Sequence, residues 1–258
     1  MNQILYHEEF GSSVNPPLVC LHGLLGSSRN WRSVARAMVE HHHVFTLDLR
    51  NHGQSFHSED ASIESMVKDL LQWMDFHKLE RSHFCGHSLG GKVVMKMACT
   101  DADRVDSLIV GDIAPRDYPE GHHIPTLDAL LSLNLRALKS RKDADVKLTE
   151  RITSWAFRQF LLTNLDFTEG QGRWIPNLQA LRSSISLLSQ NPLKSKDRYD
   201  GPCLFIRGGK SGYVRTEHFD EIYQFFPNGS IQTMDGVGHD VHVENRALFV
   251  NILQSFLT

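Results

Sequence analysis

Short apolar runs recur along the chain, and each ends in a glycine-rich or polar turn. They are PLVCLHGLLG (17–26), VFTLDLRNHG (44–53), HFCGHSLGG (83–91), SLIVGDIAP (107–115), CLFIRGG (203–209) and IQTMDGVGH (231–239). Runs of this kind are typical of parallel strands that are buried on both faces.

Helical patterns separate these runs. Apolar side chains fall on one face over residues 31–39 and again over residues 63–74, where Ser62 is the predicted N-cap, and residues 244–257 are predicted to form a final helix. Strand and helix in alternation predict an α/β fold with a doubly wound, mostly parallel sheet. Functional residues of such sheets gather at the carboxyl ends of the strands.

The alternation stops between Pro115 and about Asp200, where leucine-rich helical spacing replaces the strand pattern. We therefore expect a core of residues 1–115 and 200–258, with residues 116–199 inserted into it. Because the insertion follows one strand and precedes the next, it is predicted to cover the carboxyl edge of the sheet as a helical cap. An ordinary helical subdomain without a gating role is the alternative interpretation.

Length and charge bear on the class of protein. A chain of 258 residues with 41% apolar side chains can bury one sizeable core. The formal charge of −3 and the pI near 6.6 supply no field that would attract nucleic acid or an anionic membrane. The first residues lack the regions of a signal peptide, and no apolar run approaches the roughly 18 residues of a membrane span. We expect a cytoplasmic protein without a nucleic-acid or membrane partner.

Neither a metal nor a cofactor is expected. The four cysteines lie far apart in sequence, without the paired spacing of a zinc or redox site: Cys20, Cys85, Cys99 and Cys203. We predict that they are buried, reduced thiols. The histidines at 41–43 lie between a helix and a strand without a second ligand cluster, which favours a solvated turn over a metal site. The same interpretation applies to His122 and His123.

Residues 86–90, GHSLG, match the G-x-S-x-G nucleophile elbow. The motif follows an apolar strand and precedes a predicted helix, which is the context that it requires. A sharp strand-to-helix turn strains the backbone of the serine, so small residues must flank it, and the turn exposes the hydroxyl at the helix N-terminus. Ser88 is therefore the predicted nucleophile, and a structural serine is the alternative.

A serine that attacks a carbonyl needs donors for the resulting oxyanion. The stretch HGLLG (22–26) follows the first strong strand, so the N–H of Leu24 is placed to lie beside that of Leu89 and to form a two-donor oxyanion hole. Main-chain donors explain why both positions can be leucine. A glycine turn needed only for packing is the alternative.

His239 is the predicted base, because VGH (237–239) follows the last apolar run and precedes the final helix. A nucleophile early in the chain and a histidine late is the order of an α/β-hydrolase triad. The histidine needs a carboxylate partner, which in the commonest arrangement follows the strand CLFIRGG, but Ser211 stands there.

Asp112 is the remaining candidate for the acid. It ends SLIVGDIAP, one strand after the nucleophile strand, and adjacent strand ends are only about 5 Å apart. A cap or turn aspartate is the alternative. Ser211 is then either a polar support for Asp112 or His239, or a loop residue. Asp235 and Asp240 are too close to His239 along the chain to reach back to its ring.

The chain resembles the α/β-hydrolase superfamily over essentially its whole length. More narrowly, it is similar to the YbfF-type bacterial esterases and their mitochondrial relatives in the abhydrolase family. The local matches, in the order of that family, are HGLLGS, DLRNHGQS, GHSLGGK, GDIAP, GGKSGYV and GHDVHVEN. GHSLGG is shared by many hydrolases, whereas the aspartate of GDIAP together with the serine of GGKSGYV is specific to this group.

The resemblance implies a triad of Ser88, His239 and Asp112, with Ser211 beside it as a candidate fourth member. It also implies hydrolysis of short-chain carboxylic esters or of acyl-CoA thioesters. We hypothesise a cofactor-free serine carboxylesterase that works through an acyl-enzyme and takes a small-molecule ester as its partner. A thioesterase or another hydrolase on the same scaffold is one alternative, and a triad-retaining ligand-binding protein is another. A monomer and a dimer are both compatible with the sequence.

Overall fold

A seven-stranded sheet forms the centre of the molecule. The computed structural model describes residues 3–168 and 170–258. The strands lie in the order β1-β3-β2-β4-β5-β8-β9. Their bounds are β1 His7–Phe10, β2 Pro17–Leu21, β3 His43–Leu47, β4 Ser82–His87, β5 Val105–Gly111, β8 Cys203–Gly208 and β9 Ser230–Met234. Only the β1–β3 pair is antiparallel among these described strands, so the predicted mostly parallel sheet is confirmed.

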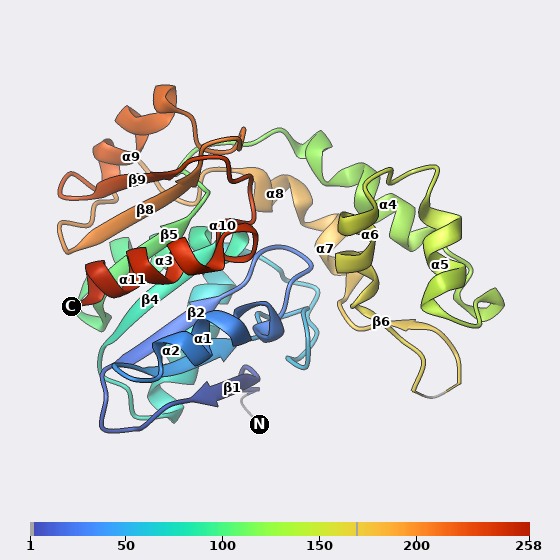
Figure 1. Ribbon diagram of the computed structural model, residues 1–258, viewed down its shortest axis with the longest axis horizontal. Helices are drawn as coiled ribbons and strands as arrows, with labels where there is room; N and C mark the ends of the chain where they lie inside the picture. Colours follow the sequence, from blue (N-terminus) through green and yellow to red (C-terminus); the bar gives the residue numbers. More distant parts are fainter. Residues whose placement is uncertain (1–2, 169) are drawn as a thin grey trace.

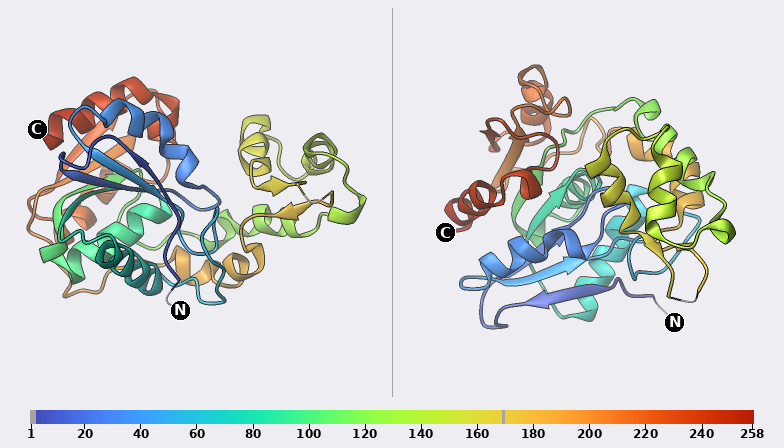
Figure 2. Two further views of the ribbon diagram at one scale, coloured as in Figure 1. Left: turned by 90° about the horizontal axis from the view of Figure 1, so that it is seen from below. Right: turned by 45° about the vertical axis from the view of Figure 1, so that its right-hand side comes forward.

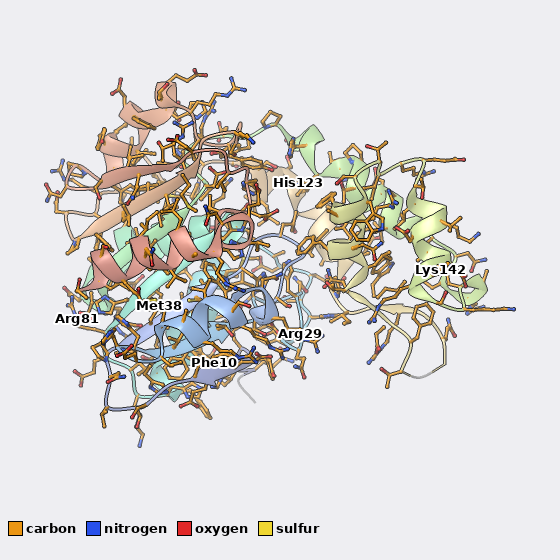
Figure 3. The ribbon with its side chains drawn as sticks, viewed as in Figure 1. Phe10, Arg29, Met38, Arg81, His123 and Lys142 are labelled. Carbon is orange, nitrogen blue, oxygen red and sulfur yellow. The ribbon has the colours of Figure 1, made fainter. Side chains whose placement is uncertain are left out.

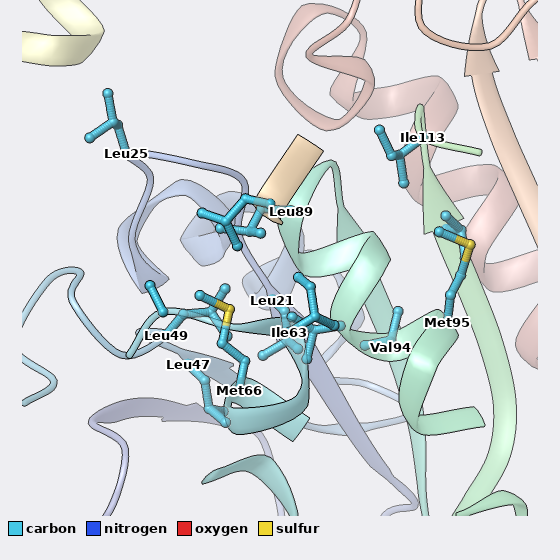
Figure 4. Packing of buried hydrophobic residues seen from close by; sticks show 14 of the residues in the cluster. Leu21, Leu25, Leu47, Leu49, Ile63, Met66, Leu89, Val94, Met95 and Ile113 are labelled. Atoms are coloured by element: carbon cyan, nitrogen blue, oxygen red, sulfur yellow. The ribbon is translucent and has the colours of Figure 1, made fainter. Parts of the chain in front are cut away.

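Helices cover both faces of the sheet, as the two views in Figure 2 show. The core helices are α1 Arg32–Met38, α2 Ile63–Phe76, α3 Leu89–Thr100, α9 Phe219–Phe225, α10 Val241–Glu244 and α11 Arg246–Leu257. On one face α1 and α11 pack together over a cluster that includes Trp31, Cys85 and Phe249. On the other face α2 and α3 pack over a larger cluster, part of which is drawn in Figure 4. Because helices pack on both faces of a mostly parallel sheet, the predicted doubly wound arrangement is confirmed.

Several local predictions can be compared with this structure. Ser62 caps α2, because its hydroxyl accepts from the Ser65 N–H at 3.3 Å. The expectation that every apolar run is buried on both faces is wrong for β9. Most residues of this strand are exposed, because β9 lies at the edge of the sheet. The polar strand β1, HEEF, was not predicted. It pairs with β3 at the opposite edge of the sheet, where polar side chains can remain in contact with solvent.

The segment between β5 and β8 is mainly helical. It contains α4 Ile124–Leu131, α5 Arg141–Leu148, α6 Trp155–Leu162, α7 Leu178–Ser183 and α8 Ile185–Ser189. Two very short strands, β6 Leu165–Asp166 and β7 Arg173–Trp174, pair antiparallel and were not predicted. Short 3-10 helices complete the chain: Ser28–Trp31, Ala102–Arg104, Glu120–His122, Leu135–Ala137 and Thr216–His218. In Figure 1, α4, α5 and α6 stand beside the core, while α7 and α8 lead back to it.

The helices of the described segments are too short or too polar to cross a lipid bilayer. The thiols of Cys20, Cys85 and Cys203 are free and buried, and that of Cys99 is partly buried. Burial raises the pKa of the Cys99 thiol to about 12, so this thiol stays protonated at neutral pH.

Candidate active site

Ser88 occupies a sharp turn between β4 and α3. Its backbone has φ 51° and ψ −112°, a region that side-chain-bearing residues rarely adopt. The turn is tight because the chain on either side has no room for a side chain. A Cβ on Gly86 would lie 2.4 Å from the Gly90 carbonyl oxygen, and one on Gly90 would lie 2.4 Å from that of Leu21. The strand, turn and helix expected around GHSLG are all present.

Two unpaired N–H groups lie beside this turn. The Gly90 N–H donates to the His22 carbonyl oxygen at 3.0 Å, which ties the loop after β2 to the first turn of α3. Within residues 3–168 and 170–258, neither the Leu24 N–H nor the Leu89 N–H has a hydrogen-bond acceptor. Both are therefore available to an oxygen atom that is bound next to Ser88.

Asp112 lies at the end of β5 with its side chain fully buried. Its Oδ2 is 2.8 Å from Nδ1 of His239 and also accepts from the hydroxyl of Ser211. Its Oδ1 accepts from the Gly208 N–H at 2.9 Å. Three donors thus compensate one buried carboxylate, as a buried charge requires.

The same geometry assigns the proton on His239. A carboxylate only accepts, so Nδ1 carries the hydrogen and donates to Asp112, which leaves Nε2 with a free lone pair. The ring is held flat against Tyr213, with centroids 3.8 Å apart and planes 17° apart. The backbone of His239 is also held, because Nε2 of His87 donates to the His239 carbonyl oxygen at 2.9 Å. Burial lowers the pKa of His87 well below its usual range, so this ring is neutral.

The other acids that follow the strand β8 in sequence are not hydrogen-bonded to His239 in the described part of the chain. Asp235 and Asp240 are exposed. Glu217 is 3.5 Å from Arg215, and Asp220 lies in α9. Asp112 is the carboxylate that is hydrogen-bonded to His239 in the described part of the chain.

A narrow pocket of about 30 Å³ opens onto Ser88, whose hydroxyl has no hydrogen-bond partner among the described residues. Its walls are formed by residues of the turn around Ser88 and of the inserted segment 116–199, together with other residues of the core. Its lining residues are Leu24, Ser88, Leu89, Lys92, Ile113, Tyr118, His123, Ile185, Leu188, Ser189 and Tyr213. Figure 3 shows His123 where the inserted segment meets the core.

Two basic residues of this lining were not predicted to lie at the site. His123 was expected in a solvated turn, but it lines the pocket, and burial lowers its pKa to about 4. Lys92 follows the elbow by one helical turn and is 3% exposed; burial lowers its pKa to about 8. The sequence clue to Lys92 is that the helix LGGKVVMKMA is apolar apart from two lysines, Lys92 and Lys96.

The solvated turn predicted at residues 41–43 is also wrong in part. His42 is buried, and His43 begins β3, where its Nε2 is 2.6 Å from Glu9 Oε1. His22 and His52 lie buried in loops with ring centroids 5.0 Å apart. As far as the structure describes the chain, no three histidine, cysteine, aspartate or glutamate side chains are grouped to hold a metal ion.

Comparison with known proteins agrees with this architecture. The family model described as alpha/beta hydrolase fold matches residues 16–246. The sn-1-specific diacylglycerol lipase ABHD11 of Mus musculus is 38% identical over 254 residues, which cover 96% of this chain and 82% of that protein. Esterase YbfF of Escherichia coli (strain K12) is 32% identical, over 94% of this chain and 93% of that one.

A solved structure of a marine microorganism esterase superposes with a TM-score of 0.95 at 32% identity, and the match covers 99% of this chain and 100% of that one. The resemblance that the motifs predicted is thereby confirmed. By the family match, the full-length relatives and the shared architecture, the chain belongs to the alpha/beta hydrolase fold family.

Proposed function

We propose that this protein is a serine carboxylesterase that hydrolyses short-chain acyl esters through an acyl-enzyme. The observation that carries the proposal is the hydrogen bond from His239 Nδ1 to the buried Asp112, which leaves the lone pair of Nε2 free to act as a base for the strained Ser88. The names of the relatives, an esterase and a lipase, support the same reaction class.

In the first half-reaction, Ser88 Oγ forms a bond to the ester carbonyl carbon while its proton moves to His239 Nε2. The carbonyl electron pair moves to oxygen, and the N–H groups of Leu24 and Leu89 stabilise the oxyanion. When the tetrahedral intermediate collapses, the bond to the alcohol oxygen breaks. That oxygen takes the proton from His239 and leaves as the alcohol.

In the second half-reaction, water attacks the acyl-enzyme and gives a proton to His239. The bond to Ser88 then breaks, the carboxylic acid leaves, and the proton returns to Ser88 Oγ. Asp112 holds the imidazole in the required tautomer and stabilises its charged form. Ser211 acts one step further away, as a positioning residue that donates to Asp112.

The short-chain preference rests on the narrow pocket. Ile185 and Leu188 of α8 and His123 come from the inserted segment and line it together with Ser88. We propose that residues 116–199 act as a cap that limits the length of the acyl group. Long acyl chains would need these side chains to move.

Steady-state hydrolysis of p-nitrophenyl butyrate tests the proposal. We expect multiple turnovers by the wild type and a loss of kcat by about 10⁴-fold or more in Ser88→Ala, with Ser230→Ala on the exposed edge strand as the matched control. Retained hydrolysis in Ser88→Ala would refute the serine mechanism. Release of a single acyl equivalent by the wild type would favour the ligand-binding alternative.

A further inference from the structure

Lys92 places a buried positive charge in the wall of the candidate active site. It is the fourth residue after Ser88 along α3, and its side chain is 3% exposed while it lines the same pocket. A buried ammonium is costly unless it is compensated. The partners of this ammonium therefore indicate what the pocket is built to receive.

The direct contacts of the Lys92 ammonium are with neutral groups. Its Nζ donates to the carbonyl oxygens of Leu188 at 2.8 Å and Gln190 at 2.7 Å. The ring of Tyr118 lies below it, with the nitrogen 5.1 Å from the centroid. An ammonium has three hydrogens, and the third has no acceptor in the part of the chain that the structure covers.

Lys96, one turn further along α3, provides the contrast. It is similarly buried, but its Nζ forms an ion pair with Asp197 Oδ2 at 2.7 Å. Lys92 has no carboxylate in an ion pair within the described residues. Lys96 is thus paired directly with a carboxylate, whereas Lys92 has only the more distant charge of Asp117, which raises the pKa of Lys92 by less than burial lowers it.

Two further donors line the pocket near Lys92. The hydroxyl of the buried Ser189 and the ring nitrogens of His123 have no hydrogen-bond partner among residues 3–168 and 170–258. Burial keeps His123 neutral by lowering its pKa to about 4, so this ring can donate one hydrogen bond. An anion at this place would find one charged donor and two neutral ones.

We propose that this subsite binds a carboxylate on the acyl group, so that the preferred substrates are half-esters of short dicarboxylic acids. The inference rests on the proposed function and names its substrate class. Side chains four residues apart on a helix have Cβ atoms about 5–6 Å apart. Ser88 is the N-cap residue of α3, the Lys92 N–H donates to its carbonyl oxygen at 3.0 Å, and both residues line the one pocket. An acyl group whose carboxylate lies two or three carbons from the ester carbonyl has the length of about one helical turn, the separation expected between Ser88 and Lys92.

Two ethyl esters of the same shape test the inference. Monoethyl succinate carries the carboxylate, and ethyl isocaproate replaces it with an uncharged branch of similar size. Ethanol release gives kcat/KM for both. We expect the wild type to prefer monoethyl succinate and Lys92→Met to lower the ratio of the two kcat/KM values by about ten- to a hundredfold, the range for a hydrogen bond to a charged group.

Lys96→Met is the matched control, because it removes a buried lysine of the same helix away from the pocket. It should lower thermal stability and leave the ratio unchanged. Lys92→Arg keeps the charge and should retain part of the preference. A wild type without preference, or a ratio that Lys92→Met does not change, would show that Lys92 merely ties α3 to the end of α8.

Calorimetric titration of the inactive Ser88→Ala variant provides a readout that does not depend on turnover or on the folding of Lys92→Met. We expect it to bind monoethyl succinate more tightly than ethyl isocaproate, and equal affinities would overturn the subsite. If the wild type hydrolyses neither ester while Ser88→Ala still prefers monoethyl succinate, the proposed function fails and the subsite stands. If the wild type hydrolyses both esters equally and Ser88→Ala binds both with equal affinity, the proposed function stands and the subsite fails.

Discussion

Backbone conformation places both Ser88 and Asp112. Each follows the last residue of a strand and has a positive φ, 51° at Ser88 and 46° at Asp112. The Ser88 N–H donates to the Gly111 carbonyl oxygen at 3.0 Å, and the Asp112 N–H donates to that of Ile206 at 2.8 Å. Strain of this kind persists where the surrounding structure holds it, and here it turns both side chains toward one edge of the sheet.

Replacing Asp112 with asparagine tests its role at the level of one atom. The amide keeps the shape but can present its NH₂ to His239 and favour the wrong tautomer, so we expect kcat for p-nitrophenyl butyrate to fall by about 10³–10⁴-fold. Ser211→Ala removes one of three donors to Asp112 and should cost less, about tenfold. Asp235→Asn, at an exposed position near His239 in sequence, is the control. Near wild-type activity in Asp112→Asn would contradict the proposed role of Asp112 as the acid.

Among the elements, the crossing of α3 over the end of β2 determines how the elbow is held. Gly90 lies in the first turn of α3, against the backbone of Leu21 and His22. The helix can approach the strand this closely because position 90 has no side chain. The approach brings the loop with Leu24 next to Ser88, and an added Cβ on Gly23 would lie 3.3 Å from Ser88 Cβ.

Gly90→Ala should therefore reverse the usual effect of alanine in a helix, which stabilises by about 1 kcal/mol relative to glycine. The new Cβ would lie 2.4 Å and 2.7 Å from two backbone oxygens, neither of which can rotate away. We expect the free energy of unfolding to fall by about 3 kcal/mol, measured by urea denaturation. Gly121→Ala, where nothing lies within 4 Å of the added Cβ, should change it little. An equal effect of both substitutions would contradict the close approach.

Across the whole molecule, buried histidines couple stability to pH. Burial lowers the pKa of His22 to about 4, and burial lowers the pKa of His52 and of His242 to about 3. In the unfolded chain a histidine has a pKa near 6.5. Between these values the unfolded chain binds protons that the folded one does not, so stability is complete above about pH 6.5 and falls as the pH drops.

His242 allows one of these contributions to be isolated, because its ring is stacked on Trp31 at 4.4 Å and phenylalanine can fill the same space. Urea unfolding between pH 6 and pH 4.5 should lose stability less steeply in His242→Phe. The slope should decrease by about 1.4 kcal/mol per pH unit, the amount for one proton. His41→Phe, at an exposed site, controls for the loss of a histidine. An unchanged slope in His242→Phe would mean that the buried ring takes up a proton in the folded state.

Local patterns were enough for part of the fold and of the candidate site. The alternation of strands and helices, the elbow at Ser88 and the cap at Ser62 depend on residues that are close in sequence. Asp112 needed one further step, the adjacency of parallel strand ends, since its bond to His239 spans 127 residues. The edge strand β1 escaped prediction because polar HEEF carries no apolar pattern, and its pairing with β3 is a tertiary contact.

By itself, the amino-acid sequence determined most strands and helices of the core, their order and the turn that holds Ser88, because helix and strand periodicity and tight-turn requirements act over a few positions. The tertiary structure alone decided what surrounds Ser88. Whether Lys92 is solvated on a helix surface or buried in the pocket with Ser88 depends on carbonyl oxygens 96 and 98 residues away. Burial and charge compensation are properties of such long-range packing, which no local pattern contains.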